Sequence, residues 1–597
     1  MYTSKKSVQI LIALMKEHNI RHCVLSSGTR NVPFVYSVEN DPFFTCYSVV
    51  DERSAAFFAL GLAQELNQPV AISCTSSTAT TNYLSAITEA FYQKVPLLVL
   101  TGDRDPYLLG QMEDQQIKQF GMYQDVIKKQ VNLPTVRNDD DFWYCERLIN
   151  EALLALDHHG KGPVHINIPL ISHEKSFSIP ALPPVRAIQR HYPTRNDSGC
   201  LAKVRELEGG KRILIICGQR WHASAEEAAA ISAFAGKFNC VVATDHLSNL
   251  HIPSAMHLYV LAETIALPIF DEMLPDVVIT LGGNFLSYGL KAKFRIRNVK
   301  HWSIQEDGSI VDVFKHLTDI FEGTPAEFFD CFVRHARPET RSDGSYFNLW
   351  KKQSDELSLP DMPHSAYSVI RAFADKLPER ALLHLSILNS TRICNYFNIP
   401  PGVKVYCNLG AYGIDGCLST FLGQSVVSEL PAFLIIGDLS FFYDMNSIRI
   451  GHLKNNIRIL LINNGGGCEF YMNTGKAKSP NLDRHTAARH DTHARGWIES
   501  LGFKYISARN AEEYLARLDQ LMVKESDRPV VLEVFTDIQT DSDVIQAAFK
   551  VMQVTQVPVT AKSKLKSMLK EMLGEEGVRR IRQLKGIKEV PDFYADV

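Results

Sequence analysis

Two apolar segments in the last third of the chain constrain its fold most. They cover residues 434–440 and 459–466, and each is a short apolar run that ends abruptly in small and oxygen-bearing side chains. This pattern is typical of a buried parallel strand that carries a polar group at its carboxyl end. We therefore expect a parallel sheet here, with Asp438 and Asn464 each placed directly after a strand.

The residues at these two strand ends are suited to binding a hard cation. Asp438 offers a carboxylate, Asn464 an amide oxygen and a nearby glycine a backbone carbonyl, which leaves coordination positions for phosphate oxygens on Mg²⁺ or Ca²⁺. A helix that begins after Gly437 would point its amino end at the same phosphates. The pair predicts a magnesium-diphosphate site; the alternative is two ordinary strand ends followed by turns.

Size and composition set broad limits. A chain of 597 residues is too long for one core and suggests three or four domains. With 45% apolar and 22% charged residues and a formal charge of −3, it is unlike a general nucleic-acid binder. The twelve cysteines include no Cys-x-x-Cys pair, which favours reduced thiols in a cytoplasmic protein. We expect neither a secretory signal nor a transmembrane segment.

Strand-like runs alternate with helical stretches three times along the chain, which predicts three doubly wound α/β domains. We expect domains over residues 1–180, 181–345 and 346–540, and a helical C-terminal extension over 541–597. Residues 562–588 carry nine Lys and Arg among leucines and methionines at helical spacing. An amphipathic helix packed on the body of the protein is one interpretation, and a membrane-surface or partner-docking helix is the other.

The two strand ends together resemble the Gly-Asp-Xaa … Asn-Asn signature of thiamine-diphosphate (ThDP) enzymes, because the 25 residues between Asp438 and Asn464 suit one strand-helix-strand unit. Such a cofactor also needs a carboxyl group beside its aminopyrimidine ring, in apolar surroundings that favour a shared proton. Glu52 fits this role, since it follows a β-prone run and precedes an apolar helix pattern. Alternatively, Asp51 and Glu52 only complement a helix dipole.

Eight ordered motifs extend the resemblance to the MenD family, the 2-succinyl-5-enolpyruvyl-6-hydroxy-3-cyclohexene-1-carboxylate (SEPHCHC) synthases. The match covers about residues 8 to 537. The motifs are Ser27-Gly28-Thr29-Arg30, Asp51-Glu52-Arg53, Thr75-Ser76-Ser77-Thr78-Ala79, Thr101-Gly102-Asp103-Arg104, Gln115 to Gln119, Leu247 to Leu250, Gly413-Ile414-Asp415-Gly416 and Gly437-Asp438-Leu439-Ser440.

This resemblance implies a pyrimidine-binding (PYR) first domain, a middle domain and a diphosphate-binding (PP) third domain. It also implies a homodimer or homotetramer whose active sites lie between subunits. It assigns catalysis to Glu52, and the metal to Asp438, Asn464 and the Gly466 carbonyl. Further cofactor contacts are implied for Thr75, Ile414, Gly437, Leu439 and Ser440, of which Ile414 would hold the cofactor bent; a plain core isoleucine is the alternative.

The family decarboxylates a 2-oxo acid with ThDP and Mg²⁺ and transfers the resulting acyl carbanion to an acceptor; 2-oxoglutarate and isochorismate are its substrates. The resemblance implies that the substrate carboxylates are bound by Thr29, Arg30, Arg104, Gln115 and Arg392. Guanidinium groups suit the recognition of carboxylates. Leu409, Tyr288 and Asp114 depart from the family pattern, where arginine, lysine and asparagine are usual. We therefore expect an altered donor or acceptor.

Two other kinds of function compete with this one. A nucleotide-dependent dehydrogenase would carry Gly-x-Gly-x-x-Gly after an early strand, and Gly28 has no such partners. A catalytically silent regulatory or scaffolding homologue would have lost Glu52 or Asp438, and both are present. Within the same class, a simple ThDP-dependent 2-oxo acid decarboxylase remains open.

Overall fold

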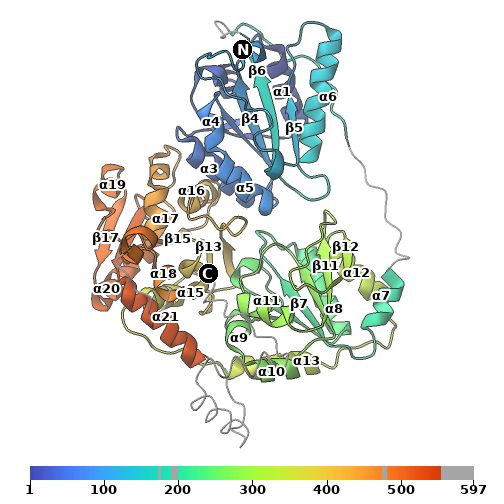
Figure 1. Cartoon of the computed structure of the whole chain (residues 1–597), viewed down its shortest axis with the longest axis vertical. Coiled ribbons are helices and arrows are strands. Elements are labelled where there is room, and N and C mark those ends of the chain that lie inside the picture. The colour runs from blue at the N-terminus through green and yellow to red at the C-terminus, as the bar shows by residue number, and fades with distance from the viewer. Residues whose placement is uncertain (172–176, 190–199, 474–480, 553–597) are drawn as a thin grey trace, which may run out of the picture. The chain divides into compact units, whose positions relative to one another are not determined.

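The computed structural model describes residues 1–171, 177–189, 200–473 and 481–552. It contains three six-stranded sheets, and every strand pair within them is parallel, with helices between most successive strands (Figure 1). This confirms the predicted α/β class. Residues 562–588, for which an amphipathic helix is predicted, lie outside the described residues.

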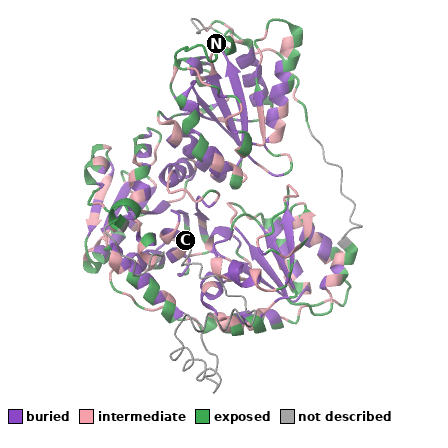
Figure 2. Cartoon of the chain, viewed as in Figure 1, coloured by how far each residue is buried: buried purple, intermediate pink, exposed green. Residues whose placement is uncertain are grey.

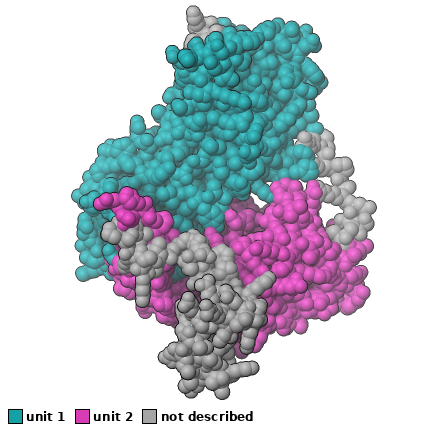
Figure 3. All heavy atoms as spheres, viewed as in Figure 1, with its two compact units in different colours: residues 1–195, 369–466, 489–537 teal, residues 196–368, 467–488, 538–597 magenta. Residues whose placement is uncertain are grey.

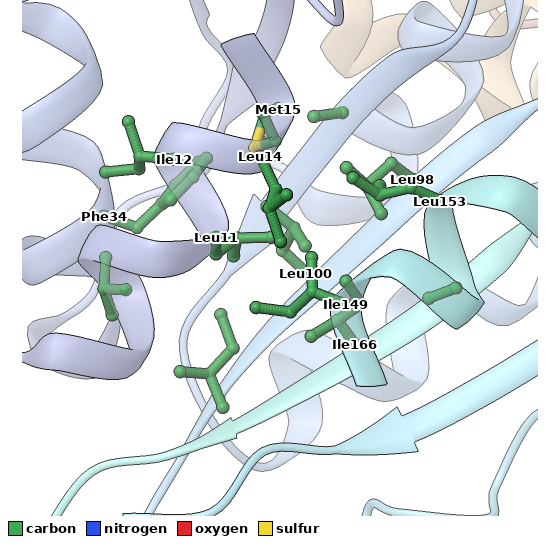
Figure 4. Close-up of a cluster of buried hydrophobic side chains, with 14 of the residues drawn as sticks. Leu11, Ile12, Leu14, Met15, Phe34, Leu98, Leu100, Ile149, Leu153 and Ile166 are labelled. Carbon is green, nitrogen blue, oxygen red and sulfur yellow. The ribbon is translucent and has the colours of Figure 1, made fainter. Parts of the chain in front are cut away.

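The first sheet has the strand order β2-β1-β3-β4-β6-β5. Its strands are β1 (His22–Leu25), β2 (Thr45–Ser48), β3 (Val70–Cys74), β4 (Leu97–Asp103), β5 (Lys129–Asn132) and β6 (Val164–Pro169). Its helices are α1 (Lys6–Glu17), η1 (Thr29–Asn31), α2 (Val32–Glu39), α3 (Glu52–Leu66), α4 (Thr78–Asn82), α5 (Leu84–Tyr92) and α6 (Asp139–Ala155). Apolar side chains of α1, α6 and β4, among them Leu11, Leu14, Leu100 and Ile149, form one buried cluster on this sheet (Figure 4).

The second sheet has the order β12-β11-β10-β7-β8-β9. Its strands are β7 (Ile213–Cys217), β8 (Cys240–Thr244), β9 (Ala255–His257), β10 (Val277–Leu281), β11 (Lys300–Gln305) and β12 (Leu317–Glu322). Its helices are α7 (Cys200–Leu207), α8 (Ala225–Lys237), α9 (Tyr259–Thr264), α10 (Leu267–Glu272), α11 (Tyr288–Arg295), α12 (Pro325–His335) and α13 (Ser345–Asp355).

The third sheet has the order β14-β13-β15-β16-β18-β17 and so repeats the topology of the first. Its strands are β13 (Arg380–Leu385), β14 (Gly402–Tyr406), β15 (Ala432–Gly437), β16 (Ile457–Asn463), β17 (Lys504–Ala508) and β18 (Val530–Phe535). Its helices are α14 (Ala366–Asp375), α15 (Asn389–Cys394), α16 (Cys417–Val427), α17 (Asp438–Tyr443), η6 (Met445–Arg449), α19 (Arg495–Ser500) and α20 (Ala511–Met522). Two further helices, α18 (Cys468–Asn473) and α21 (Ile538–Met552), contact each other.

The chain forms two compact units (Figure 3). One comprises residues 1–195, 369–466 and 489–537 and holds the first and third sheets; the other comprises 196–368, 467–488 and 538–597 and holds the second. The central strands of all three sheets are buried (Figure 2), as their continuous apolar runs predict.

Within the first unit, α3 packs closely against α16. These helices occupy equivalent places, because α3 follows β2 in the first sheet and α16 follows β14 in the third. A Cβ at Gly61 of α3 would lie 2.0 Å from the Thr420 carbonyl oxygen, and one at Gly423 of α16 would lie 2.1 Å from that of Phe58. Glycine at both positions therefore lets the two backbones touch.

The proline-containing segment that follows β6 is partly attached to the first unit. Residues 177–189 form neither helix nor strand, but the Arg186 N–H donates to Glu146 Oε1 (2.6 Å) and the Ile188 N–H to Asn150 Oδ1 (2.8 Å). Side chains of α6 thus satisfy backbone groups that the prolines keep out of regular structure. Among the described helices, none is long and apolar enough to cross a membrane.

Candidate functional site

The two apolar segments, residues 434–440 and 459–466, meet at the carboxyl ends of β15 and β16. These strands pair in parallel, with Gly437 opposite Ile462. Asp438 is buried, and its carboxylate accepts hydrogen bonds from the N–H groups of Leu439 (2.6 Å), Gly465 (2.7 Å) and Gly466 (3.1 Å). One carboxylate therefore holds the segment that contains Asn464 and Gly466 against the start of α17.

The residues beside this carboxylate suit a diphosphate held through a cation. A Cβ added to Gly437 would meet nothing within 4 Å, so the chain is open where β15 turns into α17. The segment that carries Asn464 and Gly466, the other groups predicted to bind the metal, is hydrogen-bonded to Asp438. Their chemistry is that of a site for a hard cation that shares its coordination with phosphate oxygens.

His490 is a neighbour of this site that the sequence did not indicate. Its Nε2 lies 3.3 Å from Asp438 Oδ2, and hydrogen bonding to Asp438 raises the pKa of the imidazole. The Thr492 N–H donates to the other ring nitrogen (3.1 Å), and the Phe442 ring packs edge-on against it. Because Nδ1 accepts the Thr492 N–H, the imidazole is the neutral tautomer that carries its proton on Nε2, the nitrogen that faces the Asp438 carboxylate.

Ile414 lies in the loop between β14 and α16. Its carbonyl accepts a hydrogen bond from the Ser440 hydroxyl (2.6 Å), which ties this loop to α17. The Ile414 side chain is only partly buried, whereas the isoleucines of β15 and β16 are nearly fully buried. Partly exposed apolar side chains are common at protein surfaces, so the role of Ile414 as a wedge stays a prediction.

A buried acid, Glu89 of α5, supports the same loop from the first domain. Its carboxylate accepts the N–H groups of Gly410 (2.7 Å) and Ala411 (2.5 Å) and a hydrogen bond from Gln93. Burial raises the pKa of Glu89, although these donors oppose the shift. The sequence alone did not indicate this contact, because the partners are more than 300 residues apart.

Glu52 is the first residue of α3, and its neighbour Asp51 makes the helix cap. The Asp51 carboxylate accepts the N–H of Ser54 (3.2 Å) and so caps α3. Glu52 lies in the first turn of the same helix, where an acid also complements the helix dipole, so its catalytic role stays a prediction. Burial raises the pKa of Glu52, and the charge of Asp51 adds to the shift. Burial raises the pKa of Cys74, the last residue of β3, and the charge of Glu52 adds to this shift.

Two arginines meet at the carboxyl edge of the first sheet. Arg30 is nearly buried, and its Nε and Nη1, like the Nε of Arg104, have no hydrogen-bond partner among the described residues. Burial lowers the pKa of Arg30, and the nearby charge of Arg104 lowers it further. Arg104 also contacts Glu113 (2.9 Å). Buried N–H donors without partners are expected where an anion binds.

The loops around these arginines hold three other predicted residues. The Arg30 N–H donates to Thr75 Oγ1 (3.2 Å), and Gln115 Nε2 donates to the Ser76 carbonyl (3.3 Å). Thr29 precedes Arg30 in η1. Gly28 has φ of +136°, and a Cβ there would lie 2.3 Å from Thr75 Cβ, so this approach requires glycine.

Four residues remain to be placed: Arg392, which is predicted to bind substrate, and the three residues that differ from the family pattern. Arg392 is on α15, which follows β13. Leu409 is buried, with 1% of its surface exposed. Asp114 is exposed. Tyr288 begins α11 in the second unit, where the Lys291 ammonium lies 5.4 Å from its ring centroid.

Comparison with known proteins identifies the class. Residues 5–122 match the family model described as "Thiamine pyrophosphate enzyme, N-terminal TPP binding domain". A benzoylformate decarboxylase from Polynucleobacter necessarius shares the fold, with a TM-score of 0.66 at 15% identity, over 90% of this chain and 99% of that one. The fold and site thus define a ThDP-dependent enzyme.

Curated relatives then show the family. The chain is 37% identical over 572 residues to the 2-succinyl-5-enolpyruvyl-6-hydroxy-3-cyclohexene-1-carboxylate synthase of Bacteroides fragilis, covering 92% of this chain and 99% of the relative. The enzyme of the same name from Flavobacterium johnsoniae is 30% identical over 556 residues, covering 91% and 98%. The chain belongs to the SEPHCHC synthase family. It is a ThDP-dependent 2-oxo acid decarboxylase and carboligase, a transferase.

Proposed function

We propose that the protein binds ThDP together with Mg²⁺ between the PYR domain of one subunit and the PP domain of another, with the diphosphate at the carboxyl ends of β15 and β16. The observation that carries this proposal is the buried Asp438 carboxylate, which joins the ends of β15 and β16 beside an open space. Asp438, Asn464 and the Gly466 carbonyl would hold the metal. Bound ThDP would supply a thiazolium ring that stabilises negative charge on the carbon from which CO₂ leaves.

The residues of the chain would then orient the bound cofactor and control the proton on its aminopyrimidine ring. Glu52 would hold a proton at the aminopyrimidine ring, because its raised pKa favours a shared proton over full ionisation. Ile414 would press against the middle of the cofactor. Gly437, Leu439, Ser440 and Thr75 would line the cofactor site without taking part in proton transfer.

For the substrates, the proposal is the reaction for which the relatives are named, with 2-oxoglutarate as donor and isochorismate as acceptor. The unpartnered N–H groups of Arg30 and Arg104 support it, because they suit a carboxylate; Thr29, Gln115 and Arg392 would assist. A second candidate is a donor with a single carboxylate. It is favoured by Leu409 and Tyr288, which replace two cations of the family pattern.

Kinetics separate the two candidates. We would measure kcat/KM for 2-oxoglutarate, pyruvate and longer 2-oxo acids, with and without isochorismate. Loss of two desolvated charge-assisted contacts, about 3–6 kcal/mol, would make 2-oxoglutarate weak relative to a less acidic donor. If 2-oxoglutarate with isochorismate is the best pair by about tenfold or more, the first candidate holds and the inference from Leu409 and Tyr288 fails.

A variant tests the anion site itself. Arg104→Gln should lower kcat/KM for a 2-oxo acid by about 10- to 100-fold, because one charge-assisted hydrogen bond is lost. Arg137→Gln provides a control, since Arg137 lies on a different loop, before α6, and is exposed. Equal effects of the two substitutions would remove Arg104 from the substrate site.

The proposal also covers the oligomeric state of the protein and its location in the cell. A homodimer or homotetramer with PYR and PP domains facing across subunits follows from the family arrangement, and the domains would divide near residues 180, 345 and 540. Cytoplasmic location agrees with the described cysteines, none of which forms a disulfide. Sedimentation of active protein as a monomer at assay concentration would contradict the oligomer.

A further inference from the structure

The loop between β14 and α16, residues 407–416, lies against α5 of the first sheet. The Glu89 carboxylate on α5 accepts the N–H of Gly410 at Oε1 (2.7 Å) and that of Ala411 at Oε2 (2.5 Å). A Cβ at Gly410 would lie 2.8 Å from the Glu89 carbonyl oxygen, so the loop touches the backbone of α5 at a point where only glycine fits. One carboxylate and one close backbone contact thus fix this part of the loop.

The groups that donate to Glu89 require both of its carboxylate oxygens. Besides the two loop N–H groups, the side-chain NH₂ of Gln93 donates to Oε1, and it also donates to the Cys407 carbonyl at the start of the loop (3.3 Å). A carboxylate accepts at both oxygens, whereas an amide of the same shape presents a donor at one of them. The loop is therefore held by an ionised acid and not by the shape of the side chain alone.

Buried amide side chains fix the direction of the Gln93 amide. Gln64 Nε2 on α3 donates to Gln93 Oε1 (2.9 Å). Gln424 Nε2 on α16 donates in turn to Gln64 Oε1 (2.7 Å), and Gln424 Oε1 lies 3.0 Å from Nδ1 of His384 on β13. All four side chains are buried. Because Gln64 occupies the oxygen of Gln93, the NH₂ of Gln93 is the group that faces Glu89.

The flanks of the loop are held by its own domain. Asn408 Nδ2 donates to Thr420 Oγ1 on α16 (3.1 Å), and the Ile414 carbonyl accepts the hydroxyl of Ser440 on α17 (2.6 Å). Residues 410 and 411, which lie between these two attachments, are held from the first domain. The position of Ile414, three residues further along the chain, therefore depends on a contact with α5.

We infer that Glu89 is a positioning residue, which holds the loop that carries Leu409 and Ile414 in the third domain of its own chain. The inference rests on the proposed function, in which the cofactor lies between the PYR domain of one subunit and the PP domain of another. Each site then depends on both PYR domains of a dimer. One supplies Glu52, and the other, which belongs to the same chain as the PP domain, supports the loop through Glu89. Glu52 and Glu89 of one chain therefore serve different sites.

Substitutions at the contact test the positioning role. Glu89→Gln keeps the size of the side chain, but in either orientation its NH₂ faces one loop N–H, which loses its acceptor. The matched control is Glu65→Gln, because Glu65 of α3 accepts the Tyr406 hydroxyl (2.6 Å), a contact between the same two domains that lies on β14 instead of the loop. Gly410→Ala forces the loop away from α5; Gly451→Ala is its control, since a Cβ there would meet nothing within 4 Å.

Three quantities are measured for each full-length variant: the ThDP Kd in excess Mg²⁺ by isothermal titration, kcat for CO₂ release from a 2-oxo acid, and the thermal midpoint. We expect Glu89→Gln and Gly410→Ala each to raise the ThDP Kd and to lower kcat by about tenfold or more, because a loop misplaced by about 1 Å no longer supports the cofactor. The two controls should stay within about threefold of the wild type. A lower thermal midpoint with unchanged Kd and kcat in Glu89→Gln would show a structural role only and overturn the inference.

Hybrid dimers test which site Glu89 serves. The two kinds of subunit carry different affinity tags, and only dimers with both tags are retained. A Glu52→Gln subunit paired with a Glu89→Gln subunit combines both changes at one site and leaves the other site intact, so we expect about half of the wild-type kcat. A wild-type subunit paired with a Glu52→Gln/Glu89→Gln subunit has one change at each site, so we expect kcat to fall by about tenfold or more. The reverse pattern would overturn the inference.

A third hybrid tests the proposed site without Glu89. A Glu52→Gln subunit paired with an Asp438→Ala subunit retains one intact site if the cofactor lies between subunits, and none if each site lies within one chain. About half of the wild-type kcat is expected. If this hybrid is inactive, the proposed function fails and the inference falls with it. If it is half active while the two Glu89 hybrids show the reverse pattern, the inference alone fails.

Discussion

The contact between α3 and α16 leads to a quantitative prediction for Gly423→Ala. The new Cβ would lie 2.1 Å from the backbone oxygen of Phe58, a distance that Cβ atoms do not adopt, and a backbone atom cannot rotate away. The two helices would have to separate by about 1 Å or more, which is the kind of overpacking that costs about 1–3 kcal/mol. Gly61→Ala should act in the same way, because its Cβ would meet the Thr420 oxygen at 2.0 Å.

Helix propensity opposes this cost. Alanine is favoured over glycine by about 1 kcal/mol inside a helix. We therefore expect Gly423→Ala to lower the free energy of unfolding of the first unit by a net amount of up to about 2 kcal/mol, the difference between these two terms. Because Glu52 is on α3, separation of the helices should also weaken ThDP binding.

Urea unfolding followed by circular dichroism measures the effect. The control is Gly236→Ala in α8, where a Cβ would meet nothing within 4 Å, so this variant should be as stable as the wild type or more so. If Gly423→Ala unfolds at a higher urea concentration than the wild type, the close approach of α3 and α16 is wrong.

Three further predictions concern the cofactor and pH. ThDP should bind only with a divalent cation, because the diphosphate and Asp438 are like charges; titration in excess EDTA checks this. Glu52→Gln should keep the ThDP Kd within about tenfold but abolish exchange at the thiazolium carbon, since the amide has no proton to relay. Burial lowers the pKa of His384 to about 4, whereas the histidine of the unfolded chain takes up a proton below its pKa of about 6.5. Acidification from pH 7 to 5 should therefore lower the free energy of unfolding by about 2 kcal/mol. His384→Gln should not show this loss.

Each of these has a contradicting outcome. Tight ThDP binding in EDTA would remove Asp438 and Asn464 from a metal site. An unchanged exchange rate in Glu52→Gln would exclude that carboxyl from the proton relay. For His384, the comparison is the loss of unfolding free energy between pH 7 and pH 5; the same loss in His384→Gln and the wild type would show that this histidine is not buried in its neutral form.

Local patterns in the sequence were sufficient for the strands and for the strand-end residues. A buried parallel strand is a continuous apolar run, and the residue after it lies at the carboxyl edge of the sheet wherever the strand is placed. For this reason Asp438 and Asn464 could be assigned to one edge before any fold was known, and the structure brings their segments together.

Tertiary structure alone decided how the first and third sheets are joined. The contact of Ser54 with Asp444 spans 390 residues, and that of Glu89 with Gly410 spans 321. No periodicity marks such residues, because an isolated Asp or Glu has the same local pattern whether it is solvated or buried. The physical reason is that strand burial follows from neighbouring residues, whereas the partner of a buried carboxylate depends on how two separately folded sheets pack.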